Sequence, residues 1–433
     1  MSSVALVVLD TLRYDYFEEI FDWLDGARFT RTYSTSHWTV PAHASLFTGR
    51  YASEVGVHGS SPTLECPEGT VAEAFQAAGY RTRCLTANPQ LYQYDGWDRG
   101  FDEFVGAAGL TPTAADVFDW AAHIEETNPG LGRYLSGLSD CLFGDCNTVR
   151  SLRHGYELYR TPTWDGGAKA VKKRLEATDF ADDEFLFVNL MEAHTPYHPP
   201  TGGDDPVSVV IADAIAEDVT DPETVRAAYR TSVEYLSEVY REIFAELESS
   251  FDYVITLSDH GELLGEHGLW NHSIGLHPEL IHVPLVISGP DITPGLRNEV
   301  TSLLDVHRTT ASLAGIDVDS RGRNLFEPLD SREFLFESHG LLPFHRAQFE
   351  RKGLSEAEFR HWQTPLNGFV DGDGNYCYET EPGDFRVIGD GDLTESKRRL
   401  DDLVEGIEKR DLGDANFEVS DGVRARLEEL GYA

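Results

Sequence analysis

The sequence predicts an α/β protein, alkaline-phosphatase-like in layout, with a mostly parallel sheet flanked by helices. Three apolar runs of strand length, Val4–Leu9, Phe185–Leu190 and Tyr253–Leu257, lack the polar alternation of a strand with one face in water. Segments with helical periodicity lie between them, and Pro222–Glu248 is the longest. Strands that alternate with helices form strand–helix–strand units, which build parallel sheets.

Turn and capping residues define the other elements of the main body. A helix is predicted from Asp305, as its cap, through Leu313, with Gly315 as its stop. The other predicted helices and strands are Thr70–Ala78, Tyr80–Thr86, Gly167–Ala177, Pro284–Ile287 and Phe334–Phe336, the last as a strand of the main body.

The predicted domains are a catalytic domain over residues 1–338 and a small C-terminal α+β subdomain over 339–433. Residues from about 104 to 164 are aromatic-rich and irregular, which indicates an insertion or cap. The C-terminal part is expected to contain a small antiparallel unit within Gly368–Val387 and a terminal helix at Asp421–Leu430.

The charge is strongly acidic, with 75 Asp and Glu residues against 35 Lys and Arg, a net charge of −40. Such a chain repels itself unless salt screens it, and at molar salt the screening length is only about 3 Å. We therefore expect a halophilic protein of a high-salt cytoplasm, without a nucleic-acid partner because no basic patch exists. No apolar run reaches the roughly 20 residues of a membrane span, and the first residues lack the features of a signal peptide.

The segment Ser36–Arg50 contains the strongest single candidate for chemistry. Thr39 is a predicted helix cap, Pro41 suits the first turn, and Gly49 ends the helix. A hydroxyl at a helix N-terminus lies beside unpaired N–H groups and the positive end of the helix dipole. That position suits a nucleophile that attacks an anionic ester, although an ordinary capped helix has the same pattern.

A metal site is predicted where two buried strands end. Asp10 follows the first strand, and Asp259 and His260 follow a strand 249 residues later. Ligands collect at the carboxyl ends of strands in such sheets. Two carboxylates, an imidazole and the Thr39 oxygen make a four-ligand site for Mn²⁺ or Zn²⁺, with Ca²⁺ and Mg²⁺ left open. A metal there would lower the pKa of the hydroxyl.

These segments together resemble the sulfatase-like branch of the alkaline phosphatase superfamily. Single motifs are weak, but their order over about residues 4–340 is specific. The matching segments, besides Asp10, are Thr39–Arg50, Ala193–Tyr197, Ser258–Glu262, Gly265–Trp270, His282–Ile287 and Leu304–Gly315. The resemblance implies metal-assisted transfer of a sulfuryl or phosphoryl group through a covalent enzyme intermediate.

The resemblance also implies roles for individual residues. Asp10, Asp259 and His260 would bind the metal, and Thr39 would be the nucleophile. The family's pattern assigns His194 to the ester oxygens, while His272 stands where many relatives have a substrate-contacting lysine and is a candidate general acid.

Three other residues are further site candidates. His43 stands one helical turn beyond Thr39, in place of the arginine of true sulfatases, and is a catalytic candidate. Arg50 and Asn88 are candidates for substrate binding, although Arg50 also suits a brace for its loop.

The departures from the family pattern favour a particular branch. True sulfatases convert a cysteine or serine to formylglycine, which Thr39 cannot form in that way. Thr11 replaces one acid of the usual tandem pair, and His260 replaces an asparagine, which favours a transition metal over Ca²⁺. The set is similar to relatives with a threonine nucleophile, the phosphodiesterases and phosphoglycerol transferases that use one or two metals.

The favoured function is a metal-dependent phosphodiesterase that acts on a small-molecule, glycan or lipid anionic ester. A sulfate-ester hydrolase without formylglycine and a phosphotransferase that modifies a glycan or lipid head group are alternatives. A catalytically inert binding protein is less favoured, because the four site residues are intact. A homo-oligomer is left open.

Overall fold

The computed structural model describes residues 2–106 except 60 and 93, and 166–410 except 198–206, 210, 216–218, 342–344, 346–348, 350, 351 and 382. Between these two parts it describes 118, 120, 123, 131–143, 146, 148, 151 and 152. The predicted terminal helix Asp421–Leu430 and most of the predicted insertion at 104–164 lie outside the described residues, although a helix, α8 (Leu131–Phe143), is described within the latter.

The main sheet has eight strands in the order β10-β2-β9-β6-β1-β5-β3-β4. The five strands from β6 to β4 are mutually parallel, whereas β9 runs antiparallel to both of its neighbours. The predicted α/β class with a mostly parallel sheet is therefore confirmed. The strands are β1 (Val4–Leu9), β2 (Ala27–Tyr33), β3 (Arg81–Thr86), β4 (Glu103–Val105), β5 (Glu184–Leu190), β6 (Tyr253–Leu257), β9 (His282–Ser288) and β10 (Gly295–Ser302).

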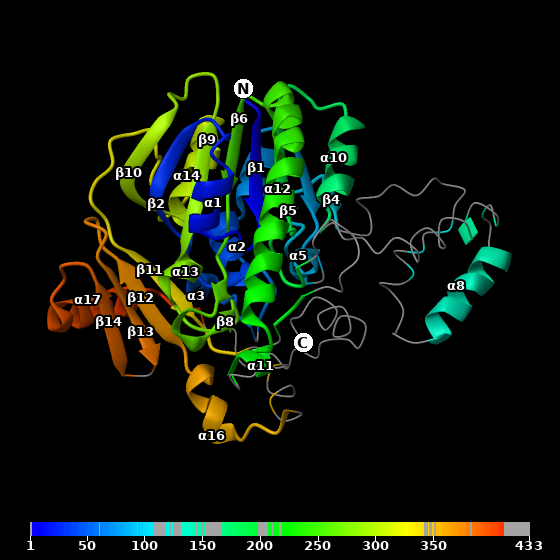
Figure 1. Cartoon of the computed structure of the whole chain (residues 1–433). Helices are drawn as coiled ribbons and strands as arrows, with labels where there is room; N and C mark the ends of the chain where they lie inside the picture. Colours follow the sequence, from blue (N-terminus) through cyan, green and yellow to red (C-terminus); the bar gives the residue numbers. More distant parts are fainter. Residues whose placement is uncertain are drawn as a thin grey trace.

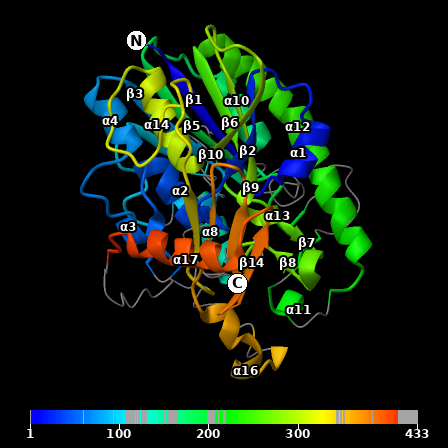
Figure 2. The ribbon, with the colours of Figure 1, turned by 90° about the vertical axis from the view of Figure 1, so that its left-hand side faces the viewer.

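Helices cover both faces of this sheet (Figure 1, Figure 2). Strand β1 supplies alternate side chains to two cores: Val4, Leu6 and Val8 pack on one face, and the residues between them on the other. The first core includes α2 (Thr39–Thr48), α4 (Val71–Ala77) and α14 (Leu303–Leu313); the second includes α1 (Tyr14–Ile20), α10 (Ala168–Glu176) and α12 (Pro222–Ser250). Burial on both faces explains the continuous apolar runs.

Short elements complete the part of the chain that the structure describes. They are α3 (Ala52–Val55), α5 (Pro89–Tyr92), α11 (Ile211–Ile215), α13 (Pro278–Ile281), α16 (Glu356–Phe359), η1 (Glu266–Gly268), η2 (Arg360–Gln363) and the hairpin β7 (Leu263–Leu264) with β8 (Trp270–Asn271). Among the described helices, none is both long and apolar enough to cross a bilayer.

A second sheet of four antiparallel strands lies beside the main body with α17 (Leu393–Glu405) (Figure 2). Its strands are β11 (Phe334–Ser338), β12 (Leu366–Val370), β13 (Tyr376–Glu381) and β14 (Asp384–Ile388). The antiparallel unit expected at Gly368–Val387 is present, but the strand at Phe334–Phe336 was wrongly placed in the main body. The expected domain boundary after residue 338 passes between β11 and β12, which are paired.

The small sheet is joined directly to the segment that precedes α2. The backbone N–H of Glu337 donates to the carbonyl oxygen of Thr35 over 2.9 Å. The hydroxyl of Ser36 donates to the carbonyl oxygen of Glu337 over 2.7 Å. The last residues of β11 therefore help to fix the chain just ahead of Thr39.

Two predicted helix caps are corrected. Helix α2 begins at Thr39 with Trp38 as its N-cap, so Thr39 is the first helical residue and its hydroxyl is not used as a cap. Helix α14 is capped by Ser302, and Asp305 is the third residue of a capping box. Gly49, in the left-handed conformation (φ 67°), ends α2 as predicted.

Candidate active site and metal centre

Parallel strands bring the candidate residues to one edge of the main sheet. Strand β1 lies between β5 and β6, and β3 is the next strand beyond β5. Asp10 and Asp259 follow the carboxyl ends of β1 and β6, while Asn88 follows β3. Helix α2 begins at the same place, because Oγ1 of Thr39 lies 3.4 Å from Nε2 of His260 and 3.4 Å from Nδ2 of Asn88.

Asp10, Asp259 and His260 form a fully buried cluster of metal-ligand type. One donor atom from each lies within 4.8 Å of the others, and each residue is 0% exposed. Oδ1 of Asp259 accepts the backbone N–H groups of Thr11 and His260, at 3.2 and 3.0 Å. Within the described chain, Oδ2 of Asp259 has no hydrogen-bond donor; imidazole nitrogens of His43 and His260 lie 3.4 Å away.

A buried carboxylate oxygen without a donor is costly unless a cation is bound there. Burial, and then the neighbouring Asp10, raise the pKa of Asp259 well above its usual value. For Asp10 the effect of burial is outweighed by His194, His260 and His43, and its pKa falls to about 2. Two close carboxylates repel each other, and a divalent cation between them would relieve that repulsion. The residues present therefore fit a divalent metal.

The imidazole of His260 is prepared for the same role. Its Nδ1 lies 2.9 Å from the carbonyl oxygen of Gly261, to which it donates, so Nε2 is left as the acceptor. Burial lowers the pKa of His260, which keeps the ring neutral, and a neutral ring is the form that binds metals.

Thr11 adopts an unusual backbone conformation directly after Asp10. Its φ is 62°, which is rare for a β-branched residue and costs energy. This turn directs its N–H to Asp259, and the hydroxyl of Tyr229 donates to its carbonyl oxygen over 2.9 Å. Its own hydroxyl donates to Oδ1 of Asp10 over 2.9 Å. Thr11, which stands in place of the second acid of the family's tandem pair, thus orders the carboxylates of Asp10 and Asp259.

Two amides hold the other oxygen of Asp10. Nδ2 of Asn88 donates to Oδ2 of Asp10 over 2.7 Å, and Nδ2 of Asn189 donates to the same oxygen over 3.1 Å. Asn88 also lies against the Thr39 hydroxyl, so it is well placed to contact an ester oxygen there.

A second group of side chains borders the metal-type cluster. The ring of His272 lies 4.7 Å from that of His260 and 4.9 Å from that of His194, centroid to centroid. Its Nδ1 lies 3.2 Å from Oε1 of Glu262, which also accepts the hydroxyl of Tyr197 at Oε2 over 2.8 Å. Burial raises the pKa of Glu262 to about 7.

His43 and Arg50 occupy places that suggest supporting roles. Nδ1 of His43 lies 2.9 Å from the carbonyl oxygen of Thr39, and its Nε2 lies 3.4 Å from Nδ2 of Asn189. Burial lowers the pKa of His43 to about 4, so the ring is neutral. Arg50 lies beyond the other end of α2, where it pairs with Asp319 at 2.6 Å. Its expected role in substrate binding stays a prediction.

Three residues that contact the site were not assigned from the sequence: Asn189, Glu262 and His37. Asn189 is a single polar residue inside an otherwise apolar strand, which was the available signal. Glu262 follows His260 by two residues, and only its side-chain partners Tyr197 and His272 show its use. His37 has no local signal at all; its Nδ1 lies 2.7 Å from the carbonyl oxygen of His272.

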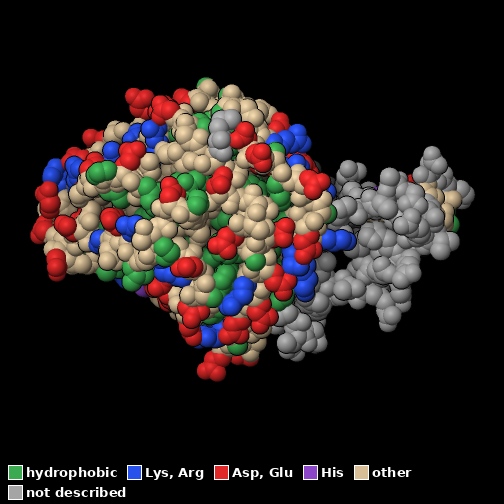
Figure 3. Space-filling model, turned by 90° about the horizontal axis from the view of Figure 1, so that it is seen from above, with side chains coloured by type: hydrophobic (Ala, Val, Ile, Leu, Met, Phe, Trp, Pro, Cys, Tyr) green, Lys and Arg blue, Asp and Glu red, His purple; other side chains and the backbone are tan. Residues whose placement is uncertain are grey.

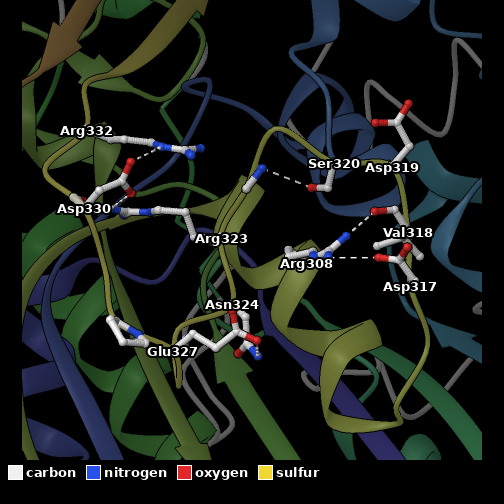
Figure 4. Close-up of a pocket in the computed structure, with 12 residues that line it drawn as sticks. Arg308, Asp317, Val318, Asp319, Ser320, Arg323, Asn324, Glu327, Asp330 and Arg332 are labelled. Carbon is white, nitrogen blue, oxygen red and sulfur yellow. Dashed lines mark hydrogen bonds and ion pairs between the residues drawn. The ribbon is translucent and has the colours of Figure 1, made fainter.

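A cavity of about 740 Å³ lies apart from this cluster (Figure 4). Its lining residues all fall between 308 and 332. Arg308 pairs with Asp317 at 2.9 Å, and Arg332 with Asp330 at 3.3 Å, so its arginines are neutralised by neighbouring acids. We therefore do not assign a binding or catalytic role to this cavity.

Comparison with known proteins identifies the family. The family model described as Sulfatase matches residues 21–316, more than half of the chain. The chain therefore belongs to the sulfatase family, and the expected sulfatase-like resemblance is confirmed.

Three relatives show the range of similar proteins. Choline-sulfatase of Rhizobium meliloti is 28% identical over 332 residues, which cover 68% of this chain and 62% of that protein. The low-salt glycan biosynthesis sulfotransferase Agl7 of Haloferax volcanii is 31% identical over 243 residues, 50% of this chain and 58% of that protein. The phosphonate monoester hydrolase of Agrobacterium radiobacter has a TM-score of 0.61 at 18% identity, over 92% of this chain and 91% of that one.

The match thus spans less than two thirds of the length of these two sequence relatives. The structural likeness confirms the fold only.

Proposed function

We propose that this chain is a metal-dependent hydrolase of monoanionic esters that acts through a covalent Thr39 intermediate, with a phosphodiester as the favoured substrate. Asp10, Asp259 and His260 would hold the metal. Asn88 and His194 would contact the ester oxygens, and His272 would protonate the leaving group.

The single observation that carries the proposal is the position of the Thr39 hydroxyl. It lies 3.4 Å from Nε2 of His260, beside a buried cluster whose three donor groups come from two segments that are far apart in the chain. A bound divalent metal there would lower the pKa of the hydroxyl and offset negative charge that develops on the ester. Mn²⁺ and Zn²⁺ suit two carboxylates and an imidazole best.

The chemistry divides into two displacements. Thr39 would attack the phosphorus atom through Oγ1 after its proton has passed to solvent, and the bond to the leaving oxygen would break. His272 would give its Nε2 proton to that oxygen while the proton of Glu262, whose pKa burial raises to about 7, moves to Nδ1. This relay keeps the ring neutral, the form that the burial-lowered pKa of His272 favours. A water molecule would then give one proton back to Nε2 of His272 and attack the same phosphorus, the Oγ1–P bond would break, and Thr39 would take up a proton from solvent. Two easier steps replace one difficult step.

The charges around the site favour a substrate with one negative charge. The basic side chains that face Asp10 are the imidazoles of His43, His194 and His260, and burial lowers the pKa of each, which favours neutral rings. Arg13 reaches the carbonyl oxygen of Glu262, but its guanidinium is paired with Asp15 and Glu266, each at 2.7 Å. Two carboxylates cancel the charge of one divalent metal, so little positive charge is left for a dianionic phosphate monoester.

Sulfuryl transfer is the second candidate, and the sequence relatives favour it. A sulfate monoester also carries one negative charge, and two relatives are described as a choline-sulfatase and a glycan sulfotransferase. In that case Thr39 would attack sulfur directly, without formylglycine. A transferase would pass the group from Thr39 to an acceptor hydroxyl in place of water.

Three chromogenic substrates separate these functions. We expect hydrolysis of bis-nitrophenyl phosphate to exceed that of nitrophenyl phosphate and nitrophenyl sulfate, in molar KCl with Mn²⁺ or Zn²⁺. Faster turnover of the sulfate would replace the phosphodiester by the second candidate. If hydrolysis is slow but a modified Thr39 accumulates, the chain is a transferase. No metal-dependent turnover and no adduct would contradict the proposal.

A further inference from the structure

A second group of metal-ligand side chains lies between the β7–β8 hairpin and α13. His267 belongs to the η1 turn, His277 is the N-cap residue of α13, and Glu279 is in the first turn of that helix. One donor atom from each lies within 4.8 Å of the others. Nε2 of His267 lies 3.5 Å from Oε2 of Glu279, and the two imidazole rings are stacked with centroids 4.0 Å apart.

One carboxylate oxygen of Glu279 would be stabilised by a bound cation. Its Oε2 is buried and has no hydrogen-bond donor within the described chain. The side chain of His267 is 33% exposed, whereas His277 is only 3% exposed. The group is therefore anchored on the protein side and open to solvent at His267, which gives an ion a path of entry.

The ring of His277 is oriented by a side chain of the small sheet. Its Nδ1 lies 3.3 Å from the hydroxyl of Tyr378, on β13 of the small sheet. If Nδ1 carries the proton, Nε2 is the free acceptor, and a partner of this kind orients metal-binding histidines. Burial, and then the neighbouring His267, lower the pKa of His277 to about 3, which keeps the ring neutral.

His267 is held in a strained backbone conformation that directs it to this group. Its φ of 58° lies in the left-handed region, which costs energy for a residue with a Cβ. The preceding residue, Glu266, fixes the turn through an ion pair with Arg13 at 2.7 Å and a bond from the N–H of Leu264 at 2.6 Å. Strain that is maintained by neighbours in this way often marks a functional position.

We propose that His267, His277 and Glu279 form a second, peripheral site for a transition metal of the zinc type, with solvent completing the coordination. Two imidazoles and one carboxylate are an established ligand set for Zn²⁺. Ligand atoms about 2.0–2.1 Å from a tetrahedral ion lie roughly 3.4 Å apart, close to the 3.5 Å between Nε2 of His267 and Oε2 of Glu279. The two stacked imidazole rings would tilt on binding so that both point a nitrogen at the ion.

The site would brace the loop of the first metal cluster. The N–H of Gly261 donates to the carbonyl oxygen of Leu280 over 2.8 Å, and a Cβ at Gly261 would lie 2.0 Å from the carbonyl oxygen of Glu279. Because α13 packs so closely against the residue after His260, an ion that ties α13 to the hairpin restrains that loop.

Zinc counting on the full-length chain tests the proposal. The background is Asp10→Asn with Asp259→Asn, which disables the first cluster, so the result does not depend on the proposed function. After removal of metals with a chelator, we expect this protein to bind one equivalent of Zn²⁺, measured by calorimetry and by metal analysis after gel filtration. Adding His267→Ala or Glu279→Gln should weaken that binding by at least about 100-fold.

His58→Gln is the matched control, since it removes a partly buried histidine outside the group and should leave the zinc count unchanged. Circular dichroism verifies that each variant is folded, and His267→Ala is expected to fold because its side chain is at the surface. The proposal is overturned if the background protein binds no zinc, or if His267→Ala and Glu279→Gln bind it as tightly as the background.

Discussion

Oγ1 of Thr39 lies 3.4 Å from Nε2 of His260, although 221 residues separate them in the chain. The sheet order produces this meeting, because β1 and β6 are parallel neighbours and α2 begins at their carboxyl edge. A nucleophile in that place can be tested apart from the metal ligands around it.

Replacement of Thr39 by alanine should reduce turnover by at least about 1000-fold, because the oxygen that we propose as the nucleophile is lost. Folding and metal content should change little, since the three other ligand residues remain. Steady-state kinetics with bis-nitrophenyl phosphate and metal analysis of the same sample measure both effects.

Thr39→Ser is the matched control, because it keeps the hydroxyl and should keep measurable activity. Mass spectrometry of a quenched reaction should find the adduct on Thr39 in the parent chain. Alanine at this position with undiminished turnover would rule out Thr39 as the nucleophile.

Asp259→Asn should lower metal occupancy and activity together, because the amide carries no negative charge with which to bind the metal. Asp252→Asn is a matched control, since Asp252 precedes β6 whereas Asp259 follows it. Asp252 accepts the N–H of Ser3 over 2.8 Å at the opposite edge of the sheet. Full metal occupancy in Asp259→Asn would mean that the ligand is assigned wrongly.

His272→Gln should slow esters with poor leaving groups far more than nitrophenyl esters. A general acid contributes about 10²–10⁴-fold where the leaving oxygen needs a proton, and little where it does not. Glu262→Gln should shift rates in the same direction by a smaller factor, because Glu262 positions His272. Equal losses for both kinds of ester would contradict general-acid catalysis by His272.

Acid should destabilise the fold through His307, which is far from these ligands in sequence and 2% exposed. Burial, and then Arg308 and Arg50, lower its pKa to about 3 from an unfolded value of 6.5. Between these values the unfolded chain binds the extra proton, so this residue makes stability fall as pH falls from 6.5 to about 3. The loss is roughly 1.4 kcal/mol per pH unit at most.

Chemical denaturation at several pH values measures this slope. His307→Gln should lower stability at pH 7, through packing and the bond of Nδ1 to Ser320 Oγ (3.1 Å), yet give a shallower pH dependence. An unchanged slope in the variant would show that His307 is not responsible.

The net charge of −40 should make folding depend on salt. Acidic side chains are scattered over the face seen in Figure 3 and are not gathered in one patch. The melting temperature should therefore rise as KCl goes from 0.1 M to about 2 M, because screening weakens repulsion throughout. Sucrose at a concentration of equal osmolality is the control; if it raises the melting temperature as much as KCl does, charge screening is not the cause.

The buried strands of the main sheet could be predicted from sequence, because burial on both faces leaves a continuous apolar run, as in β1 and β6. Strand β10 gave no such signal, since most of Gly295–Glu299 is exposed and the strand is defined by its pairing with β2. Strand β11 is apolar and buried like a main-sheet strand, so composition alone could not show that it pairs with β12.

Some residues of the candidate site could likewise be predicted from the sequence, and others could not. Asp10, Asp259 and His260 follow buried strands, and the carboxyl edge of a parallel sheet is where such residues meet. The contacts of Glu262 with Tyr197 and His272 depend on loops that meet only in the folded chain. The cap at Trp38 was missed because threonine is the stronger capping residue by statistics. In the folded chain the Thr39 hydroxyl faces the metal-type cluster.

The bonds from β11 to Thr35 and Ser36 have a consequence for modularity. A gene fusion that replaces everything after residue 333 would remove hydrogen-bond partners from the segment that leads into Thr39, the proposed nucleophile. Recombination at that point would therefore alter reactivity together with whatever the exchanged part contributes. A boundary just before β11 is therefore a poor site for exchanging the C-terminal part with that of another protein.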